Sequence, residues 1–155
     1  MTDLILEQDA FIRKIGLNKD IKHGFFLGAG ASISAGIPSA ESCIWEWKRS
    51  IFLSNNAGLE PQFSELTLST SRHKIQKWLD NQARYPKLGD ASEYGFYIEK
   101  CYDTNEDRQK FFDSKIRGAK PHVGYKLLCL LAEAKLTDTI FTTNFDNLVI
   151  RTYSY

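Results

Sequence analysis

Apolar and polar positions follow a helix-like period near the start of the chain. Apolar residues recur among charged ones between residues 3 and 16, and Gly16 is a suitable place for a helix to end, so the pattern predicts a helix over 3–16. The next segment, "HGFFLGA" at 23–29, is a continuous apolar run that ends in glycines. Such a run predicts a central parallel strand with both faces buried.

The same patterns predict a second helix over "AESCIWEWKRSIF", which follows Pro38 and Ser39. Ile44, Trp47 and Ile51 share one face of this helix, and Ser39 is a good candidate for its N-cap because its hydroxyl can accept a backbone hydrogen bond.

Another helix and a second strand are predicted near the end of the chain. In "VGYKLLCLLAEA" the apolar face is formed by Leu127, Leu128 and Leu131, and Pro121 suits the first position of this helix because its missing N–H would be unpaired there. "TIFTT" at 139–143 is β-branched and aromatic, which favours a strand.

The middle of the chain, about 54–118, shows no strand alternation and is predicted to be a helical insertion with loops at 55–61 and 85–90. Asp90 with Glu93 matches a capping box, Thr104 can cap a later helix, and Gly118 stands where a left-handed residue ends one. Trp45, Trp47 and Trp78 are expected in the core or an interface.

These elements predict an α/β fold with an open, Rossmann-like parallel sheet interrupted by the helical insertion. Two strands cannot close a core, since a parallel pair needs helices on both faces and further strands beside it. We therefore expect residues 1–155 to be the N-terminal part of a larger domain, with the remaining strands after Tyr155.

Composition narrows the choice of ligand. The 155 residues are 43% hydrophobic and 25% charged with a net charge of +1, and the basic residues form no stripe. Direct binding to nucleic acid or to an anionic membrane is therefore not expected. A small neutral or mildly anionic ligand suits this balance better.

The N-terminus and the cysteines indicate the compartment. Acidic residues stand where a secretory signal would have a basic head, and no stretch of 18 apolar residues occurs, so we expect a cytoplasmic location. Cys43, Cys101 and Cys129 are odd in number and contain no C-x-x-C pair, which argues against a disulfide framework and a metal site. Buried or half-buried free thiols are predicted.

The glycine-rich stretch "GAGASISAGIP", 28–38, follows the first predicted strand and opens a helix. This arrangement points backbone N–H groups at a phosphate. The dinucleotide fingerprint of dehydrogenases fits weakly, because its third glycine is Ile33 here and its acidic partner is replaced by Lys48 and Arg49. A P-loop is excluded, because no Lys follows Gly36.

Two linked motifs resemble those of the sirtuins. "GAGASISAGIP" is similar to their Gly-Ala-Gly-x-Ser-x-x-x-Gly-Ile-Pro signature, and "TTNFD" at 142–146 is similar to their Thr-Gln-Asn-Ile-Asp motif, with Asn144 and Asp146 in register. The order and separation of the motifs agree as well. The two Cys pairs of the zinc-bearing deacylases are lacking, and Ser39-Ala40-Glu41 replaces their Asp-Phe-Arg. Both departures resemble the sirtuin-like NAD+ hydrolases of bacterial anti-phage defence proteins.

The resemblance implies that NAD+ is a substrate held across the carboxyl ends of the two strands. It implies that the turn at 28–32 meets the pyrophosphate, that Asn144 is catalytic beside the nicotinamide ribose, and that Asp146 contacts the carboxamide. An amide can fix a water or a ribose hydroxyl while the sugar gains oxocarbenium character. The implied binding residues are Gly28, Ala29, Gly30, Ser32, Gly36, Ile37, Pro38, Asn144 and Asp146.

The family also uses a His base that follows the Asn motif. His23, His73 and His122 all precede Asn144, so we expect the 155 residues alone to bind NAD+ poorly and to hydrolyse little. A homo-oligomer and a phage protein that triggers activity are the partners implied by the resemblance.

Other interpretations stay open. The glycines could serve only packing, Ser32 and Ser34 could simply bond within the turn, and Asn144 and Asp146 could cap a helix. The function classes to be compared are an NAD+ hydrolase, a module that binds NAD+ or ADP-ribose without chemistry, and a protein deacylase.

Overall fold

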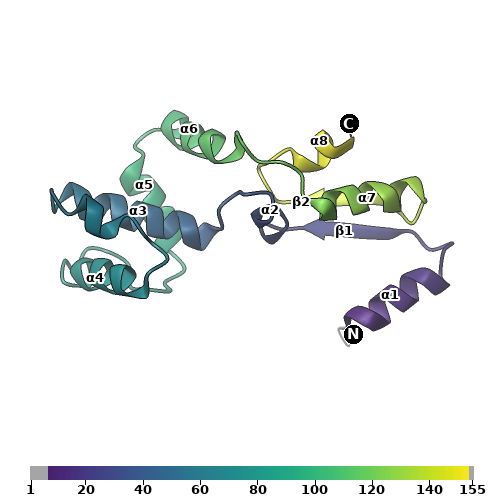
Figure 1. The fold of residues 1–155 in the computed structure, drawn as a ribbon, viewed down its shortest axis with the longest axis horizontal. Coiled ribbons are helices and arrows are strands. Elements are labelled where there is room, and N and C mark those ends of the chain that lie inside the picture. Colours follow the sequence, from purple (N-terminus) through teal and green to yellow (C-terminus); the bar gives the residue numbers. More distant parts are fainter. Residues whose placement is uncertain (1–6, 154–155) are drawn as a thin grey trace. The chain divides into compact units, whose positions relative to one another are not determined.

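The computed structural model describes residues 7–153, which form a mixed α/β structure of two compact units (Figure 1). Unit 1 is built from residues up to Gly36 and from Ala119 onward, and unit 2 is the intervening Ile37–Gly118. The helix predicted over 3–16 corresponds to α1, which spans Gln8–Leu17. The first residues of that prediction, 3–6, lie outside the described residues. Unit 2 takes in the helix after Ser39 as well as the stretch predicted as an insertion.

Unit 1 carries the sheet. Its elements are α1, β1 (His23–Leu27), α2 (Gly30–Ile33), α7 (Val123–Glu133), β2 (Thr137–Thr142) and α8 (Leu148–Tyr153). β1 and β2 pair in parallel, with Phe25 beside Ile140 and Leu27 beside Thr142, so both strands end at one edge. α7 packs against both β2 and α8 (Figure 1).

The prediction that the first strand is buried on both faces is wrong for the described residues. Phe26 and Phe141 are register partners and therefore share a face, and they are 72% and 61% exposed. Phe25 and Leu27 point the other way and are half-buried. The physical reason is that the described elements pack on only part of this sheet.

Several predicted helix ends are also wrong. α7 begins at Val123, two residues after Pro121, and its N-cap His122 makes no side-chain capping bond. Leu127 on its predicted apolar face is exposed, whereas Tyr125 is buried. Gly118 does not have the predicted left-handed backbone, and the helix before it, α6 (Asn105–Ile116), ends with Arg117 as its C-cap in the right-handed region.

Unit 2 is helical and holds the main hydrophobic core. Ser39 caps α3 (Ala40–Ser54) by accepting a hydrogen bond from the Ser42 N–H, and Thr104 caps α6 through the Asp107 N–H, so both predicted caps are confirmed. Trp45 and Trp47 are buried in this core and Trp78 packs against it, as expected. The helical elements are α3 (Ala40–Ser54), a 3₁₀ turn (Glu60–Phe63), α4 (Ser69–Asp80), α5 (Glu93–Cys101) and α6 (Asn105–Ile116).

The predicted capping box at Asp90 and Glu93 is replaced by a different arrangement. α5 begins at Glu93, and Asp90 forms a turn that accepts hydrogen bonds from the Ser92 N–H and hydroxyl, each at 2.8 Å. These bonds hold the pKa of Asp90 below its ordinary value. Glu93 accepts from the Gly89 N–H at 2.9 Å, so its carboxylate turns toward the preceding loop and the core.

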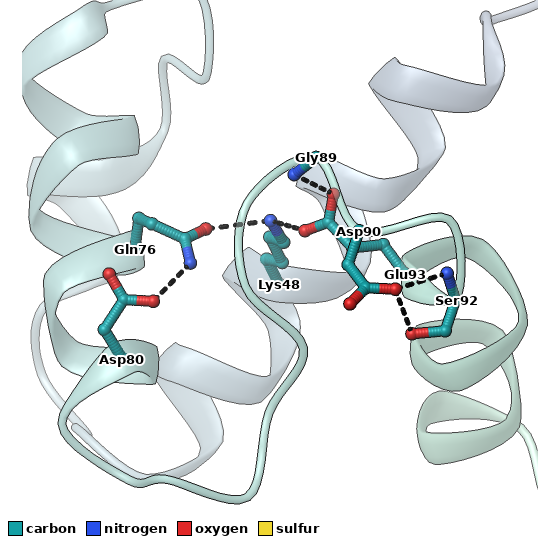
Figure 2. Close-up of polar contacts among 7 residues, drawn as sticks. All are labelled: Lys48, Gln76, Asp80, Gly89, Asp90, Ser92 and Glu93. Carbon is teal, nitrogen blue, oxygen red and sulfur yellow. Dashed lines mark hydrogen bonds and ion pairs between the residues drawn. The ribbon is translucent and has the colours of Figure 1, made fainter.

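Glu93 belongs to a buried polar cluster, which Figure 2 shows between α3, α4 and α5. The Lys48 side chain is fully buried, pairs with Glu93, and donates a hydrogen bond to Gln76 at 2.8 Å. Gln76 in turn donates to Asp80 at 2.8 Å. The Lys48 ammonium also lies over the rings of Trp45 and Tyr97, so the charge is compensated within unit 2.

Candidate functional site

The two sequence motifs meet at the edge where both strands end. β1 stops at Leu27, directly before the glycine turn, and β2 stops at Thr142, directly before the Asn144–Asp146 segment. The pairing continues one residue further, because the Thr143 N–H donates to the Leu27 carbonyl at 3.2 Å. Parallel strands thus bring residues more than a hundred positions apart in the chain into one group within unit 1.

Asn144 connects the two motifs directly. Its Nδ2 donates to the Gly28 carbonyl at 3.0 Å and to Ser32 Oγ at 2.9 Å. A backbone carbonyl can only accept, so the nitrogen end of the amide must face it. Both amide N–H groups are therefore committed inside the protein. Oδ1 is the end of Asn144 left to accept a hydrogen bond from a ligand.

Ser32 lies at the centre of this group and is only 2% exposed. Its hydroxyl donates to Asp146 Oδ2 at 2.6 Å, accepts from Asn144, and lies 3.1 Å from the Tyr125 hydroxyl. Because a hydroxyl has one proton and that proton goes to Asp146, Tyr125 must be the donor in the last contact. Ser32, Tyr125, Asn144 and Asp146 are called the Ser32 network below.

Asp146 uses both carboxylate oxygens. Oδ2 accepts from Ser32, and Oδ1 accepts from the Leu148 N–H at 3.0 Å, at the start of α8. Asp146 therefore bonds to the first N–H of α8 as well as to the glycine turn, although it stands one residue before the cap position of that helix. The sequence resemblance places Asp146 at a nicotinamide carboxamide, which stays a prediction.

Tyr125 is the member of the Ser32 network that the sequence analysis missed. The helix after Pro121 was interpreted through its leucines, whereas Tyr125 is the fully packed residue of α7. A signal was present, because a tyrosine on an otherwise apolar helix face needs a partner for its hydroxyl once it is buried. Here that partner is Ser32.

The glycine turn itself is partly closed by its own backbone. The N–H groups of Ala31 and Ser32 donate to the carbonyls of Gly28 and Ala29 at 3.0 and 3.1 Å, because the turn runs straight into α2. Apart from the adjacent residues in the chain and, for Gly30, the backbone of α2, no described protein atom lies within 4 Å of the position that a Cβ would take on Gly28 or Gly30. Packing among the described residues therefore does not require glycine at either position.

Gly36 has a different reason to be glycine. Its φ of +90° is in the region that side chains avoid, so a substitution there would be strained. Ala29 is the N-cap of α2, without a side-chain bond. Ile37 and Pro38, the remaining predicted binding residues, belong to unit 2, where Ile37 is buried and Pro38 half-buried.

A pocket of about 210 Å³ lies beside the network, between α2 and the start of α7. Such a volume is below the usual range for small-molecule sites, so it could take only a part of a dinucleotide. His122 lies on its wall but is not a member of the Ser32 network. The pocket is lined by Leu27, Gly30, Ala31, Ser34, His122, Gly124, Tyr125 and Leu128.

Within residues 7–153, no group of three or more His, Cys, Asp or Glu side chains is placed to hold a metal ion. Across the same range, none of the helices combines the length and apolar character needed to cross a membrane. The three cysteines are free thiols, with Cys43 buried and Cys101 and Cys129 half-buried.

No protein-family model matches this chain, and none of the curated proteins compared with it matches. The Ser32 network and the two motifs that supply its residues are the features of the chain that bear on its function.

Proposed function

We propose that the chain is part of a sirtuin-like, Rossmann-type NAD+ hydrolase that releases nicotinamide and leaves ADP-ribose. The observation that carries this proposal is the direct bonding of the two motifs, in which Asn144 joins Gly28 and Ser32 across 116 and 112 residues. A glycine turn at the carboxyl end of a parallel strand is where open α/β sheets hold nucleotides. The open space beside Gly28 and Gly30 supports close approach of a ligand.

The chemistry asked of Asn144 is modest and suits a neutral amide. Nicotinamide leaves NAD+ as a neutral molecule, so the protein needs no acid, and the ribose gains oxocarbenium character. With both N–H groups held by Gly28 and Ser32, the amide can turn only Oδ1 toward the sugar. Oδ1 would accept a hydrogen bond from the attacking water or a ribose hydroxyl and so orient it. Ser32 and Asp146 keep the amide in place.

A second function, ligand binding without turnover, is favoured by a specific observation. The Ser32 hydroxyl and both oxygens of the Asp146 carboxylate are already hydrogen-bonded within the protein, and no histidine is a member of the network among the described residues. Such a site can bind NAD+ or ADP-ribose and serve in assembly. A protein deacylase is the least favoured of the three classes, because the chain has no Cys pairs.

The test replaces Asn144 with Ala and uses Asn147→Ala, an exposed asparagine three residues on, as the matched control. NAD+ and ADP-ribose binding is measured by calorimetry and nicotinamide release by chromatography. We expect binding to the 155-residue chain to weaken in Asn144→Ala and to persist in Asn147→Ala, with little turnover in either. Binding that is equal in both variants would overturn the placement of NAD+ beside Asn144.

Turnover separates the hydrolase from the binding module. In a longer protein that also contains the His base expected after the Asn motif, we expect nicotinamide to be released. The same protein with Asn144→Ala should release none. Detectable turnover by these 155 residues alone would contradict the expected location of that base. We propose that the activity serves anti-phage defence by depleting NAD+ in the cytoplasm. The active form would be a homo-oligomer that a phage protein triggers. Measuring cellular NAD+ levels during infection would test this setting.

A further inference from the structure

A second, larger pocket of unit 1 lies between α7 and α8. Its volume is about 700 Å³, within the range of sites that hold small organic ligands. α7 contributes Lys126, Cys129 and Leu130, which share one face at a spacing of three and four residues, and α8 contributes Arg151 and Thr152. Lys120 and Pro121 complete the lining, and we call this site the α7–α8 pocket.

The wall of the α7–α8 pocket combines apolar surface with one sign of charge. Pro121, Leu130, the Cys129 thiol and the aliphatic stems of the lysines supply the apolar part. Lys120, Lys126 and Arg151 supply three positive charges, and none of the described residues that line the pocket is an Asp or Glu. The chain as a whole carries only +1, so this local excess of positive charge is not a consequence of overall composition.

The charges of these three cations are not compensated by carboxylates of the described residues. Between residues 7 and 153, none of them forms an ion pair with a carboxylate, unlike Lys22, Lys48, Arg72, Lys110 and Lys115. Cations that line one pocket without a counter-charge repel one another, and a bound anion would relieve this repulsion. Arg presents a donor fork that fits carboxylate and phosphate groups.

We propose that the α7–α8 pocket binds a small amphipathic anion, a molecule with a carboxylate or phosphate head and an apolar body. The head lies among Lys120, Lys126 and Arg151, and the apolar body lies against Pro121, Leu130 and Cys129. The site is separate from the proposed NAD+ site, because it shares no residue with the Ser32 network. It therefore does not depend on whether the chain hydrolyses NAD+.

Cys129 provides a reporter inside the pocket. The rate at which iodoacetamide alkylates Cys129 in the intact 155-residue chain is measured by mass spectrometry, with decanoate as the anionic probe and decyltrimethylammonium as a cation of equal chain length. We expect decanoate to slow the alkylation of Cys129 at least threefold and the cation to have little effect. Cys43 and Cys101, which lie in unit 2, are the internal references.

The variant Lys126→Gln/Arg151→Gln removes two of the three charges, and Lys74→Gln/Lys77→Gln on α4 is the matched control, checked for folding by circular dichroism. Protection by decanoate should disappear in the first variant and persist in the second. Equal protection by both probes, or protection that survives in the first variant, would show a merely apolar pocket and overturn the proposal.

Three further outcomes would also overturn it. If an acidic peptide protected Cys129 and decanoate did not, the occupant would be a protein segment. If protection arose without any probe as the protein concentration was raised, the occupant would be a second copy of the chain. Unchanged alkylation under every condition would mean that the pocket takes no ligand of the proposed class.

Discussion

Ser32 is held by three neighbours from two distant segments of the chain, and none of these contacts is local in the sequence. Its hydroxyl bonds to Tyr125 on α7 and to Asn144 and Asp146 after β2. The motif spacing predicted that Asn144 and Asp146 belong with the glycine turn, but it could not predict which atoms bond. That assignment depends on counting protons, because each hydroxyl and amide has a fixed number to donate.

Ser32→Ala should therefore remove the hydroxyl that the buried Tyr125 and the half-buried Asn144 and Asp146 share. We expect a loss of about 1–3 kcal/mol in the free energy of unfolding. Ser34→Ala is the matched control, since Ser34 is exposed on the same short turn, and it should change stability by less than about 0.5 kcal/mol. Urea denaturation measures both. Equal stability of the two variants would contradict the bonding described for Ser32.

Cys101 offers a test by pH. Burial raises the pKa of its thiol from 9.0 to about 11, and a raised pKa keeps the thiol protonated and unreactive at neutral pH. Between pH 8 and pH 10 the thiolate fraction at Cys101 should rise about a hundredfold, compared with about tenfold for a thiol of pKa 9.0.

The alkylation rate of Cys101, followed by mass spectrometry beside free cysteine in the same solution, measures this difference. Circular dichroism at pH 10 shows that the chain is still folded. A rise no steeper than that of free cysteine would mean that the Cys101 thiol is not desolvated.

Helix ends show how far local sequence determines an element. Ser39 and Thr104 cap their helices as predicted, because the capping bond lies within three residues and needs no other part of the fold. Asp90 and Glu93 have the right spacing for a capping box, yet Glu93 is drawn toward Lys48, a residue 45 positions earlier in the chain. A distant buried charge outweighed the local motif, and the sequence gives no sign that Lys48 is buried.

Glu93→Gln tests how strongly α3 and α5 depend on this charge pair. It leaves the fully buried Lys48 ammonium without a counter-charge, so we expect a loss of about 3–5 kcal/mol in the free energy of unfolding. Glu46→Gln is the control, because Glu46 pairs with Lys115 at 2.7 Å where both side chains are partly exposed. It should cost less than about 1 kcal/mol.

Thermal and urea unfolding of the two variants give the comparison. Similar losses would mean that Gln76, Trp45 and Tyr97 compensate the Lys48 charge without Glu93.

At the scale of the whole molecule, the two units differ in how far they bury their apolar side chains. The hydrophobic core lies in unit 2, around Trp47, which packs against Tyr94 and Phe111 with ring centres 5.2 and 5.4 Å apart. Unit 1 instead exposes Phe26 and Phe141 on its sheet. This exposure is consistent with the expectation that a two-stranded parallel sheet needs further strands and helices to bury its faces. The boundary between the two units at Ile37 was not evident from the sequence pattern.

A chain of residues 37–118 alone should therefore fold, with a cooperative thermal transition and a helical circular dichroism spectrum. Its core is local in sequence and needs no residue of unit 1. In the same fragment Trp47→Ala should remove the transition, since truncating a buried aromatic ring costs about 3–5 kcal/mol. A fragment that melts without cooperativity would show that unit 2 depends on unit 1.

In the sequence, unit 2 stands between β1 and β2, and this has a consequence for the order in which the chain folds. β1 and β2 must find each other across all of Ile37–Gly118, and the entropy lost in closing that loop grows with the number of flexible residues in it. Once unit 2 has folded, roughly a hundred flexible residues become roughly thirty, which lowers the cost of strand pairing by about 1 kcal/mol. Folding of unit 2 first therefore favours strand pairing, and with it the assembly of the Ser32 network from residues of unit 1.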